Sequence, residues 1–163
     1  MDLIISFVAE YLYGLVILFA IGYLIWQYRS RWLELFIAAF CIGGIAYLLA
    51  KLTTNWISDP RPFIETGKAP LIPSALDNGF PSDHTLLVAA VAAIVTLANW
   101  KIGLVIWVLA LIIGLARVYA GVHHLLDIAG SFILVGLAIG LYLAGRRIFS
   151  YIKDQSKIND LKL

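Results

Sequence analysis

The chain has 163 residues, and 62% of them are hydrophobic, compared with roughly 45–50% in soluble domains. Its mean hydropathy is +0.92 and its formal net charge is only +2. These values exclude a soluble globular domain, and they provide no basic patch that would indicate a nucleic-acid partner. We predict one integral membrane domain over residues 1–163. Because the N-terminus carries the acidic Asp2 and no basic residue, we expect no cleavable signal peptide.

Five apolar segments approach the length of about 20 residues that a membrane helix needs. In chain order they cover approximately residues 3–28, 32–50, 82–100, 101–118 and 123–145. Residues 146–163 are polar enough to form a solvated tail on the cytoplasmic side. The sequence therefore predicts an all-α integral membrane protein, a bundle of about five transmembrane helices with one long loop between the second and the third.

That loop, residues 58–85, holds all five prolines of the chain and cannot be a continuous helix. Loops of this length are usually functional or disordered. This one retains several large apolar side chains, so we predict that it packs against the bundle and has a function: Phe63, Ile64, Leu71, Ile72 and Phe80.

The orientation follows from the distribution of lysine and arginine. With five spans, one face receives eight basic residues: Arg29, Arg31, Lys101, Arg146, Arg147, Lys153, Lys157 and Lys162. The other face receives four: Lys51, Arg61, Lys68 and Arg117. We expect the first face to be cytoplasmic and the loop to be extracytoplasmic, in the plasma or inner membrane of the cell. The position of the N-terminus depends on whether the first segment spans the membrane or lies in its interface.

Counting along the helices brings several ionisable residues to one level. His84 lies 17 residues before Lys101 and Arg117 lies 16 residues after it, so both sit about 25 Å from the cytoplasmic end on neighbouring helices. Lys51 and Asp127 lie 20 and 19 residues from basic residues of that same end, which is about 30 Å. Ionisable residues at membrane depth indicate function.

His123 and Asp127 form the most informative pair. They are four positions apart, so on a helix they share one face and the carboxylate can accept a hydrogen bond from the imidazole N–H. Such a bond selects one tautomer and leaves the other ring nitrogen free as a nucleophile or base. Gly121 provides the turn from the fourth span into the fifth.

The stretch FPSDHT predicts the start of a helix, with Ser82 as the capping residue and Asp83 in the first turn. Free backbone N–H groups at a helix start bind anions such as phosphate. Polar residues near span ends are often merely interfacial, and we interpret His124, Glu10 and Glu34 in that way. For Lys51 this interpretation stays open.

The blocks KLTTNWISDPRP, PSDH and RVYAGVHHLLD resemble the three signature blocks of the type 2 phosphatidic acid phosphatase (PAP2) superfamily. They follow the family order from Lys51 to Asp127, and they look most like the undecaprenyl-diphosphate phosphatase branch of bacteria. The resemblance implies a membrane lipid phosphatase that needs neither a metal nor another cofactor, with a lipid phosphate as substrate and membrane lipids as its surroundings. It implies that His123 forms a phosphohistidine, oriented by Asp127, and that His84 protonates the leaving oxygen.

The resemblance also implies a set of phosphate-binding residues: Arg61, Arg117, Lys51 and Ser82, with Asp83 beside them. Two of these depart from the family pattern. Lys51 lies three residues, nearly one helical turn, before the usual position of the lysine, which is occupied by Thr54. Asp83 replaces the usual glycine, so we expect its carboxylate to point away from the phosphate.

The leading hypothesis from the sequence is a phosphatase that acts on undecaprenyl diphosphate at the extracytoplasmic surface. The alternatives are a phosphatidylglycerophosphate or phosphatidate phosphatase, a lipid phosphotransferase, and a noncatalytic membrane adaptor on the same scaffold. The sequence leaves the oligomeric state open.

Overall fold

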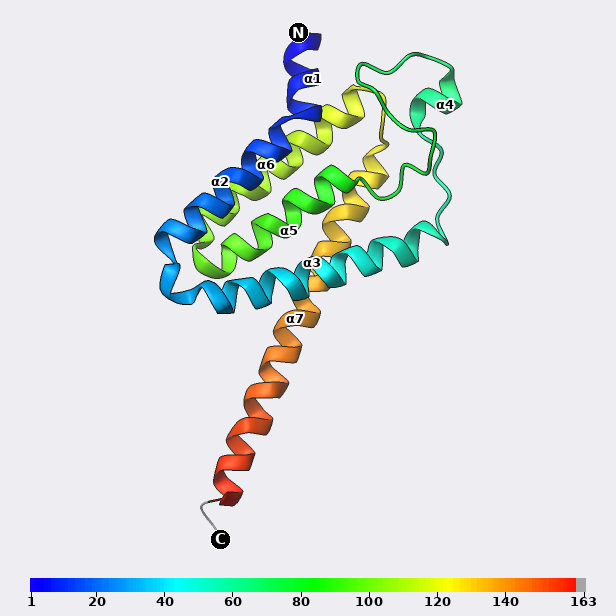
Figure 1. The fold of residues 1–163 in the computed structure, drawn as a ribbon. Coiled ribbons are helices and arrows are strands. Elements are labelled where there is room, and N and C mark those ends of the chain that lie inside the picture. Colours follow the sequence, from blue (N-terminus) through cyan, green and yellow to red (C-terminus); the bar gives the residue numbers. More distant parts are fainter. Residues whose placement is uncertain (161–163) are drawn as a thin grey trace.

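The computed structural model describes residues 1–160, with side chains through Ser156, and this part of the chain is helical without a β-strand. Figure 1 shows the arrangement of the helices, which are α1 (Asp2–Glu10), α2 (Leu12–Gln27), the 3-10 turn η1 (Arg29–Arg31), α3 (Trp32–Thr54), α4 (Pro62–Thr66), α5 (Asp83–Ala98), α6 (Trp100–Tyr119) and α7 (Leu125–Asp160). The predicted all-α membrane fold is confirmed.

By length and composition, the described residues contain three or four spans instead of the five predicted. Three helices, α3, α6 and α7, are long and apolar enough to cross a membrane, and α1 and α2, which bend by 47° at Tyr11, together match either a fourth, broken span or a re-entrant loop. Helix α5 has 16 residues, about 24 Å, less than the hydrocarbon core of about 30 Å. It ends at Asn99, whose side chain accepts hydrogen bonds from the backbone of Lys101 and Ile102 and so begins α6.

Helix α5 lies at the centre of the bundle and contacts α2, α3, α6 and α7 (Figure 1). Its inward positions are small side chains with no exposed surface: Val88, Ala89, Ala92 and Val95. Small residues let neighbouring helices approach closely, which is the usual source of packing energy inside a membrane. Helix α5 therefore holds the site residues at its start in a tightly packed frame.

Basic residues of the predicted cytoplasmic face meet at one end of the bundle. Arg31 Nε lies 3.0 Å and Arg146 Nη1 lies 3.4 Å from the carboxylate of Glu34. At the same end, Asn99 donates a hydrogen bond of 2.9 Å to the Tyr23 hydroxyl. These contacts place the turns after α2 and α5 on one side of the molecule, with the long loop at the opposite ends of α3 and α5.

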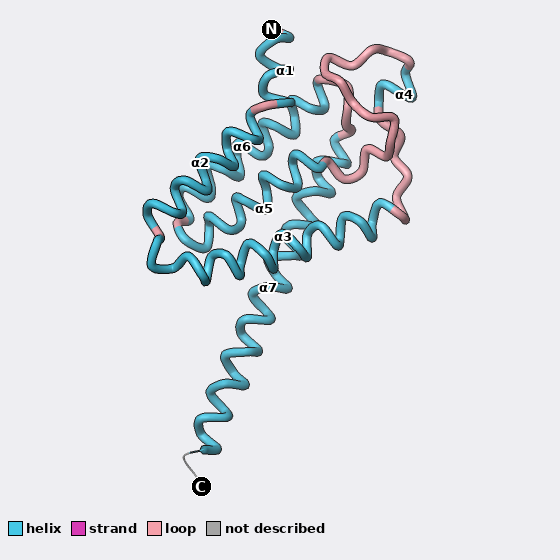
Figure 2. Tube along the Cα trace, in the orientation of Figure 1, coloured by secondary structure: helices cyan, strands magenta, loops and turns pink. Residues whose placement is uncertain are grey.

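The long loop packs on the bundle, as predicted (Figure 2). Ile72 is buried with Ala120 and Val122, and Phe63 packs against this cluster. The loop backbone is tied to the end of α6 by a hydrogen bond of 3.0 Å from Leu71 N–H to the Ala120 oxygen.

The predicted tail continues α7 as a helix to Asp160, extends beyond the bundle (Figure 1), and has exposed side chains from Arg146 through Ser156. Residues 146–160 contain neither proline nor glycine. An existing helix therefore propagates through them, adding one backbone hydrogen bond per residue. Residues 161–163, the end of the predicted tail, lie outside the described part of the chain.

Candidate active site

His123 and Asp127 form a buried pair at the start of α7. Gly121, with φ of +76°, provides the sharp turn after α6, and His123 is 2% exposed while Asp127 has no exposed surface. His123 Nδ1 lies 3.1 Å from Asp127 Oδ2, which also accepts a hydrogen bond of 2.9 Å from the backbone N–H of His124. The carboxylate thus holds the proton on Nδ1, and Nε2 keeps its lone pair.

Arg61 lies beside that nitrogen, close enough to donate a hydrogen bond to its lone pair. Its Nη1 is 3.3 Å from His123 Nε2 and donates a hydrogen bond of 3.0 Å to the Val122 oxygen. Its Nε donates to Asp77 Oδ1 at 2.7 Å, which fixes the plane of the guanidinium. A phosphate that binds this arginine therefore meets the nucleophilic nitrogen.

The environment of His123 favours its neutral form. Burial lowers the pKa of the imidazole below its ordinary value, and Arg117 and Arg61 act in the same direction, whereas the hydrogen bond with Asp127 opposes them. A neutral imidazole is the form that can attack phosphorus.

Ser82 precedes α5 as predicted, but its side chain does not cap the helix. It is fully buried, and its hydroxyl accepts a hydrogen bond from Thr85 Oγ1 at 3.2 Å. The backbone of Ser82 joins α5 to α7, since its oxygen accepts a bond of 3.0 Å from Ser131 Oγ and its N–H donates to the Asp127 oxygen at 3.4 Å. Ser82 thereby aligns the helix that carries His84 with the helix that carries Asp127.

His84 and Arg117, predicted to share one level, line one cavity of about 390 Å³. Glu10 and Tyr13 line it too, and the Tyr13 ring packs edge-on against His84 with 4.2 Å between ring centroids. Arg117 is buried and donates to the Ala9 oxygen at 2.9 Å, while its Nε has no partner among the described residues. A buried guanidinium N–H without a partner is suited to an anion that enters the cavity.

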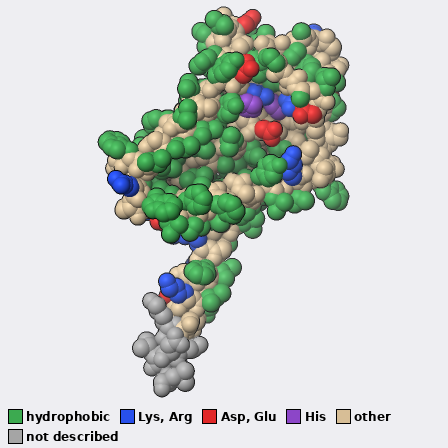
Figure 3. All heavy atoms as spheres, viewed as in Figure 1, with side chains coloured by type: hydrophobic (Ala, Val, Ile, Leu, Met, Phe, Trp, Pro, Cys, Tyr) green, Lys and Arg blue, Asp and Glu red, His purple; other side chains and the backbone are tan. Residues whose placement is uncertain are grey.

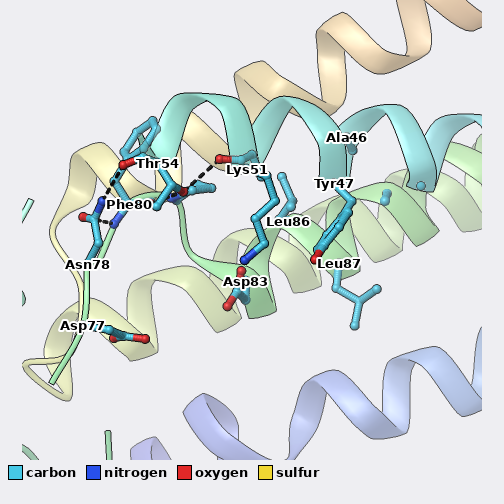
Figure 4. Close-up of a pocket in the computed structure, with 14 residues that line it drawn as sticks. Ala46, Tyr47, Lys51, Thr54, Asp77, Asn78, Phe80, Asp83, Leu86 and Leu87 are labelled. Carbon is cyan, nitrogen blue, oxygen red and sulfur yellow. Dashed lines mark hydrogen bonds between the residues drawn. The ribbon is translucent and has the colours of Figure 1, made fainter. Parts of the chain in front are cut away.

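Lys51 and Asp83 lie in a neighbouring cavity between α3 and α5 (Figure 4). Both are exposed, and Lys51 Nζ lies 5.6 Å from the centroid of the Tyr47 ring. The Asp83 carboxylate therefore lines a different cavity from His84 and Arg117.

A second group of polar residues surrounds His124, next to the His123–Asp127 pair. His124 Nδ1 is 3.1 Å from Asp59 Oδ1, and His124 Nε2 is 3.4 Å from Glu65 Oε2. Burial raises the pKa of the Asp59 carboxyl, and the adjacent Asp127 raises it further. His124, interpreted from the sequence as an interfacial residue, thus sits between two carboxyl groups.

Asp59, His124 and Asp127 place ligand atoms within 4.8 Å of one another, so they could hold a metal ion. Asp127 Oδ2 already accepts two hydrogen bonds, whereas the buried Oδ1 has no partner among the described residues. A cation at this position would therefore share with His123 the carboxylate that orients the imidazole.

Sequence reasoning missed four residues that the structure brings to the site: Glu10, Tyr13, Asp59 and Asp77. Only Glu10 carried a usable signal, an ionisable residue inside an apolar segment. The others depend on how the loop and the bend at Tyr11 fold back on the bundle.

The histidine side chains gather with neighbouring Lys or Arg and acidic side chains in one small group on a face that is otherwise largely hydrophobic, and further Lys or Arg side chains lie apart from this group (Figure 3). The fold and this group define a multi-pass membrane protein with a histidine-based site for an anionic group.

Comparisons with known proteins agree with this class. Residues 32–149 match the model of the PAP2 superfamily. Undecaprenyl-diphosphatase BcrC of Bacillus subtilis is 33% identical over 144 residues, which cover 86% of this chain and 72% of that protein. Phosphatidylglycerophosphatase B of the same organism is 28% identical over 148 residues, 84% of this chain and 68% of that protein.

A solved structure shares the fold. The crystal structure of a transmembrane PAP2 type phosphatidylglycerolphosphate phosphatase from Bacillus subtilis has a TM-score of 0.59 and 23% identity, and the match covers 90% of this chain and 76% of that one. The chain belongs to the PAP2 superfamily. The predicted family and enzyme class, a membrane lipid phosphatase, are confirmed.

Proposed function

We propose that this protein removes the terminal phosphate of a lipid diphosphate, such as undecaprenyl diphosphate, at the extracytoplasmic face of the membrane. The observation that carries the proposal is the buried chain Arg61–His123–Asp127, with contacts of 3.3 and 3.1 Å. It presents a lone-pair nitrogen beside an arginine that can bind a phosphate oxygen. The orientation is supported by the contacts of Arg31 and Arg146 at the other end of the bundle.

In the first step His123 Nε2 forms a bond to the terminal phosphorus, and the bond between that phosphorus and the bridging oxygen breaks. Protonated His84 gives its proton to the departing oxygen. Arg61 and Arg117 stabilise the charge that develops on the remaining phosphate oxygens, and Asp127 stabilises the positive charge on His123.

In the second step water attacks the phosphohistidine. His84, now neutral, accepts a proton from the water, the N–P bond breaks, and inorganic phosphate leaves. His123 returns to its neutral form with the proton on Nδ1. The two steps need no group beyond these side chains and water.

The names of the relatives support a lipid phosphate as substrate, and BcrC of Bacillus subtilis supports a diphosphate. The match to phosphatidylglycerophosphatase B supports a second candidate substrate, a phosphomonoester of a glycerolipid. A phosphotransferase would use the same first step, with a lipid hydroxyl in place of water.

The test is phosphate release by the purified protein in detergent with EDTA, on a panel of polyprenyl diphosphates, polyprenyl monophosphates, phosphatidylglycerophosphate and phosphatidate. We expect release from the diphosphate without added metal. Thin-layer analysis of products from lipid mixtures distinguishes hydrolysis from transfer to a second lipid. His123→Ala should abolish release, and His84→Ala should lower it about 100-fold or more.

Trapping with ³²P-labelled substrate should give an acid-labile phosphoprotein that His123→Ala lacks. Full release by His123→Ala, or activity that requires Mg²⁺, would refute the mechanism. A protein that releases phosphate from no member of the panel would favour the noncatalytic adaptor.

A further inference from the structure

The cavity between α3 and α5 has two kinds of lining. Its volume is about 430 Å³. Toward the middle of the helices the lining is apolar: Gly43, Ala46, Ala50, Leu86 and Ala90. Toward the loop it is polar, with Lys51, Asp77 and Asp83 (Figure 4). Such a lining suits a molecule with a charged head and an apolar tail.

Two residues that line this cavity also connect it to the site around His123 and His84. Asp77 accepts the hydrogen bond of 2.7 Å from Arg61 Nε, and Asp83 directly precedes His84 at the start of α5. The cavity of Lys51 therefore adjoins the arginine that faces His123 and the helix start that carries His84.

Lys51 is the cation of this cavity. Its side chain is exposed, and no carboxylate among the described side chains lies within 4.0 Å of its ammonium group. Figure 4 shows the side chain directed from α3 toward Asp83 at the start of α5. Stacking over Tyr47 leaves the ammonium N–H groups available to an anion.

The displacement of the lysine along α3 has a structural counterpart. Thr54, one turn nearer the loop, donates hydrogen bonds to the oxygens of Ala50 and Phe80 at 2.8 and 3.1 Å, so it braces the loop and carries no charge. The cation of α3 is thus about 4.5 Å farther from the loop than a lysine at position 54 would be. It is thus nearer to the apolar part of the cavity lining.

We propose that Lys51 binds the inner phosphate of a lipid diphosphate, the phosphate that stays on the lipid, and that it makes the enzyme select diphosphates over monophosphates. The inference rests on the proposed function. When the bridging bond breaks, the leaving group is the inner phosphate, and its charge grows in the transition state. A cation there stabilises the transition state more than the bound substrate. A lipid monophosphate has no second phosphate, so Lys51 contributes little to its hydrolysis.

The test compares kcat/KM for a polyprenyl diphosphate and the monophosphate of the same chain length, in the same micelles. Lys51→Gln should lower the value for the diphosphate about tenfold or more, the loss expected for one hydrogen bond to a charged group, and change the value for the monophosphate less than about threefold. Lys51→Arg should restore most of the preference. The matched control is Lys68→Gln, which removes an exposed cation of the same loop face and should leave the ratio of the two values unchanged.

Several results would overturn the inference. Equal losses on both substrates would make Lys51 a general phosphate ligand, and no loss on either would remove it from the binding site. A wild-type enzyme that cleaves the monophosphate and not the diphosphate would overturn the inference. The protein would then still be a lipid phosphatase, but one that is specific for monophosphates. A wild-type protein that cleaves neither lipid would overturn the proposed function itself. Melting temperatures of the Lys51 variants, measured alongside, separate a loss of selectivity from a loss of fold.

Discussion

The hydrogen bond between His123 Nδ1 and Asp127 Oδ2 determines which ring nitrogen is free to react. Asp127→Asn keeps the size of the side chain and removes its charge, so the amide no longer stabilises the positive charge of a phosphohistidine. We expect kcat to fall about 100-fold or more while the protein stays folded. Phosphate release measures the effect. The control is His124→Gln, which retains the backbone N–H that Asp127 accepts and should change kcat only a few-fold; similar losses in both variants would contradict the assignment.

The lowered pKa of His123 predicts the acidic limb of the pH profile. His123 must be neutral to attack, and burial lowers its pKa below the ordinary histidine value, which is about 6.5. Activity should therefore be retained below pH 6.5 and fall only as the pH drops through the lowered pKa. His84 must be protonated in the substrate complex to donate its proton, so kcat should also fall at high pH, which gives a bell-shaped profile. A plot of kcat from pH 4 to 9 checks this, and a flat profile would show that the two histidine roles are misassigned.

The raised pKa of Asp59 predicts a pH-dependent stability. A carboxyl whose pKa is higher in the folded than in the unfolded protein, where it is about 3.9, favours folding when protonated. Its contribution is lost as the pH rises from the unfolded pKa through the raised folded pKa. Asp59→Asn, which cannot ionise, should raise the melting temperature at pH 7.5 relative to the wild type and leave it nearly unchanged at pH 4. A lower melting temperature at pH 7.5 would show that the ionised carboxylate stabilises the fold through His124.

At the scale of elements, the loop is held against α3 and α7 by Asn78 and Gly79. The Asn78 side chain donates to the oxygens of Ile57 and Thr54 at 2.7 and 3.2 Å and accepts from the backbone N–H of Asp59. It thus ties the end of α3 to the residues on both sides of Arg61. The loop is a structural part of the site, because its backbone sets the position of the arginine.

Gly79 allows the loop to approach Asp127 closely. A Cβ at this position would lie 3.1 Å from Asp127 Oδ2 and 3.1 Å from the Asp59 oxygen, and neither can move away easily because the first is buried and the second belongs to the backbone. Gly79→Ala should displace Asp127 from His123 and lower kcat about tenfold or more. Phosphate release and the melting temperature measure the outcome. The matched control is Gly136→Ala in α7, where a Cβ meets nothing within 4 Å; equal activities of the two variants would contradict the argument.

At the scale of the whole molecule, the two opposite ends of the bundle differ in their number of basic residues. Lys101 lies in the turn region at the end where Arg31, Glu34 and Arg146 meet, and Lys68 lies in the long loop. The excess of basic residues at the first end predicts that it faces the cytoplasm. The site would then open to the extracytoplasmic side.

Cysteine labelling tests this orientation. On a Cys41→Ser background, which removes the single native cysteine, Lys68→Cys should react with a membrane-impermeant maleimide in intact cells. Lys101→Cys should react only after the membrane is permeabilised. The reverse pattern would place the site in the cytoplasm and exclude an extracytoplasmic substrate.

Several features of this protein were predictable from its sequence because they depend on local spacing and on composition. Long apolar segments specify membrane helices, since an unpaired backbone is costly in lipid, and the positions of Lys101, His84 and Arg117 set their common level through the helical rise. The spacing of four residues between His123 and Asp127 likewise predicts their contact. Composition predicted a polar tail after residue 145, and the helical conformation of that tail follows from the propagation of α7.

The tertiary structure alone decided the contacts between segments far apart in the chain. Arg61 reaches His123 across 62 positions, Tyr13 packs on His84 from the other side of the bend at Tyr11, and Lys51 faces a cavity shared with Asp83. No periodicity encodes such contacts, because they depend on how a proline-rich loop and a broken helix close on the bundle. Local spacing therefore specifies the helices and the His123–Asp127 pair, whereas the packing of the chain specifies which cations meet the phosphate.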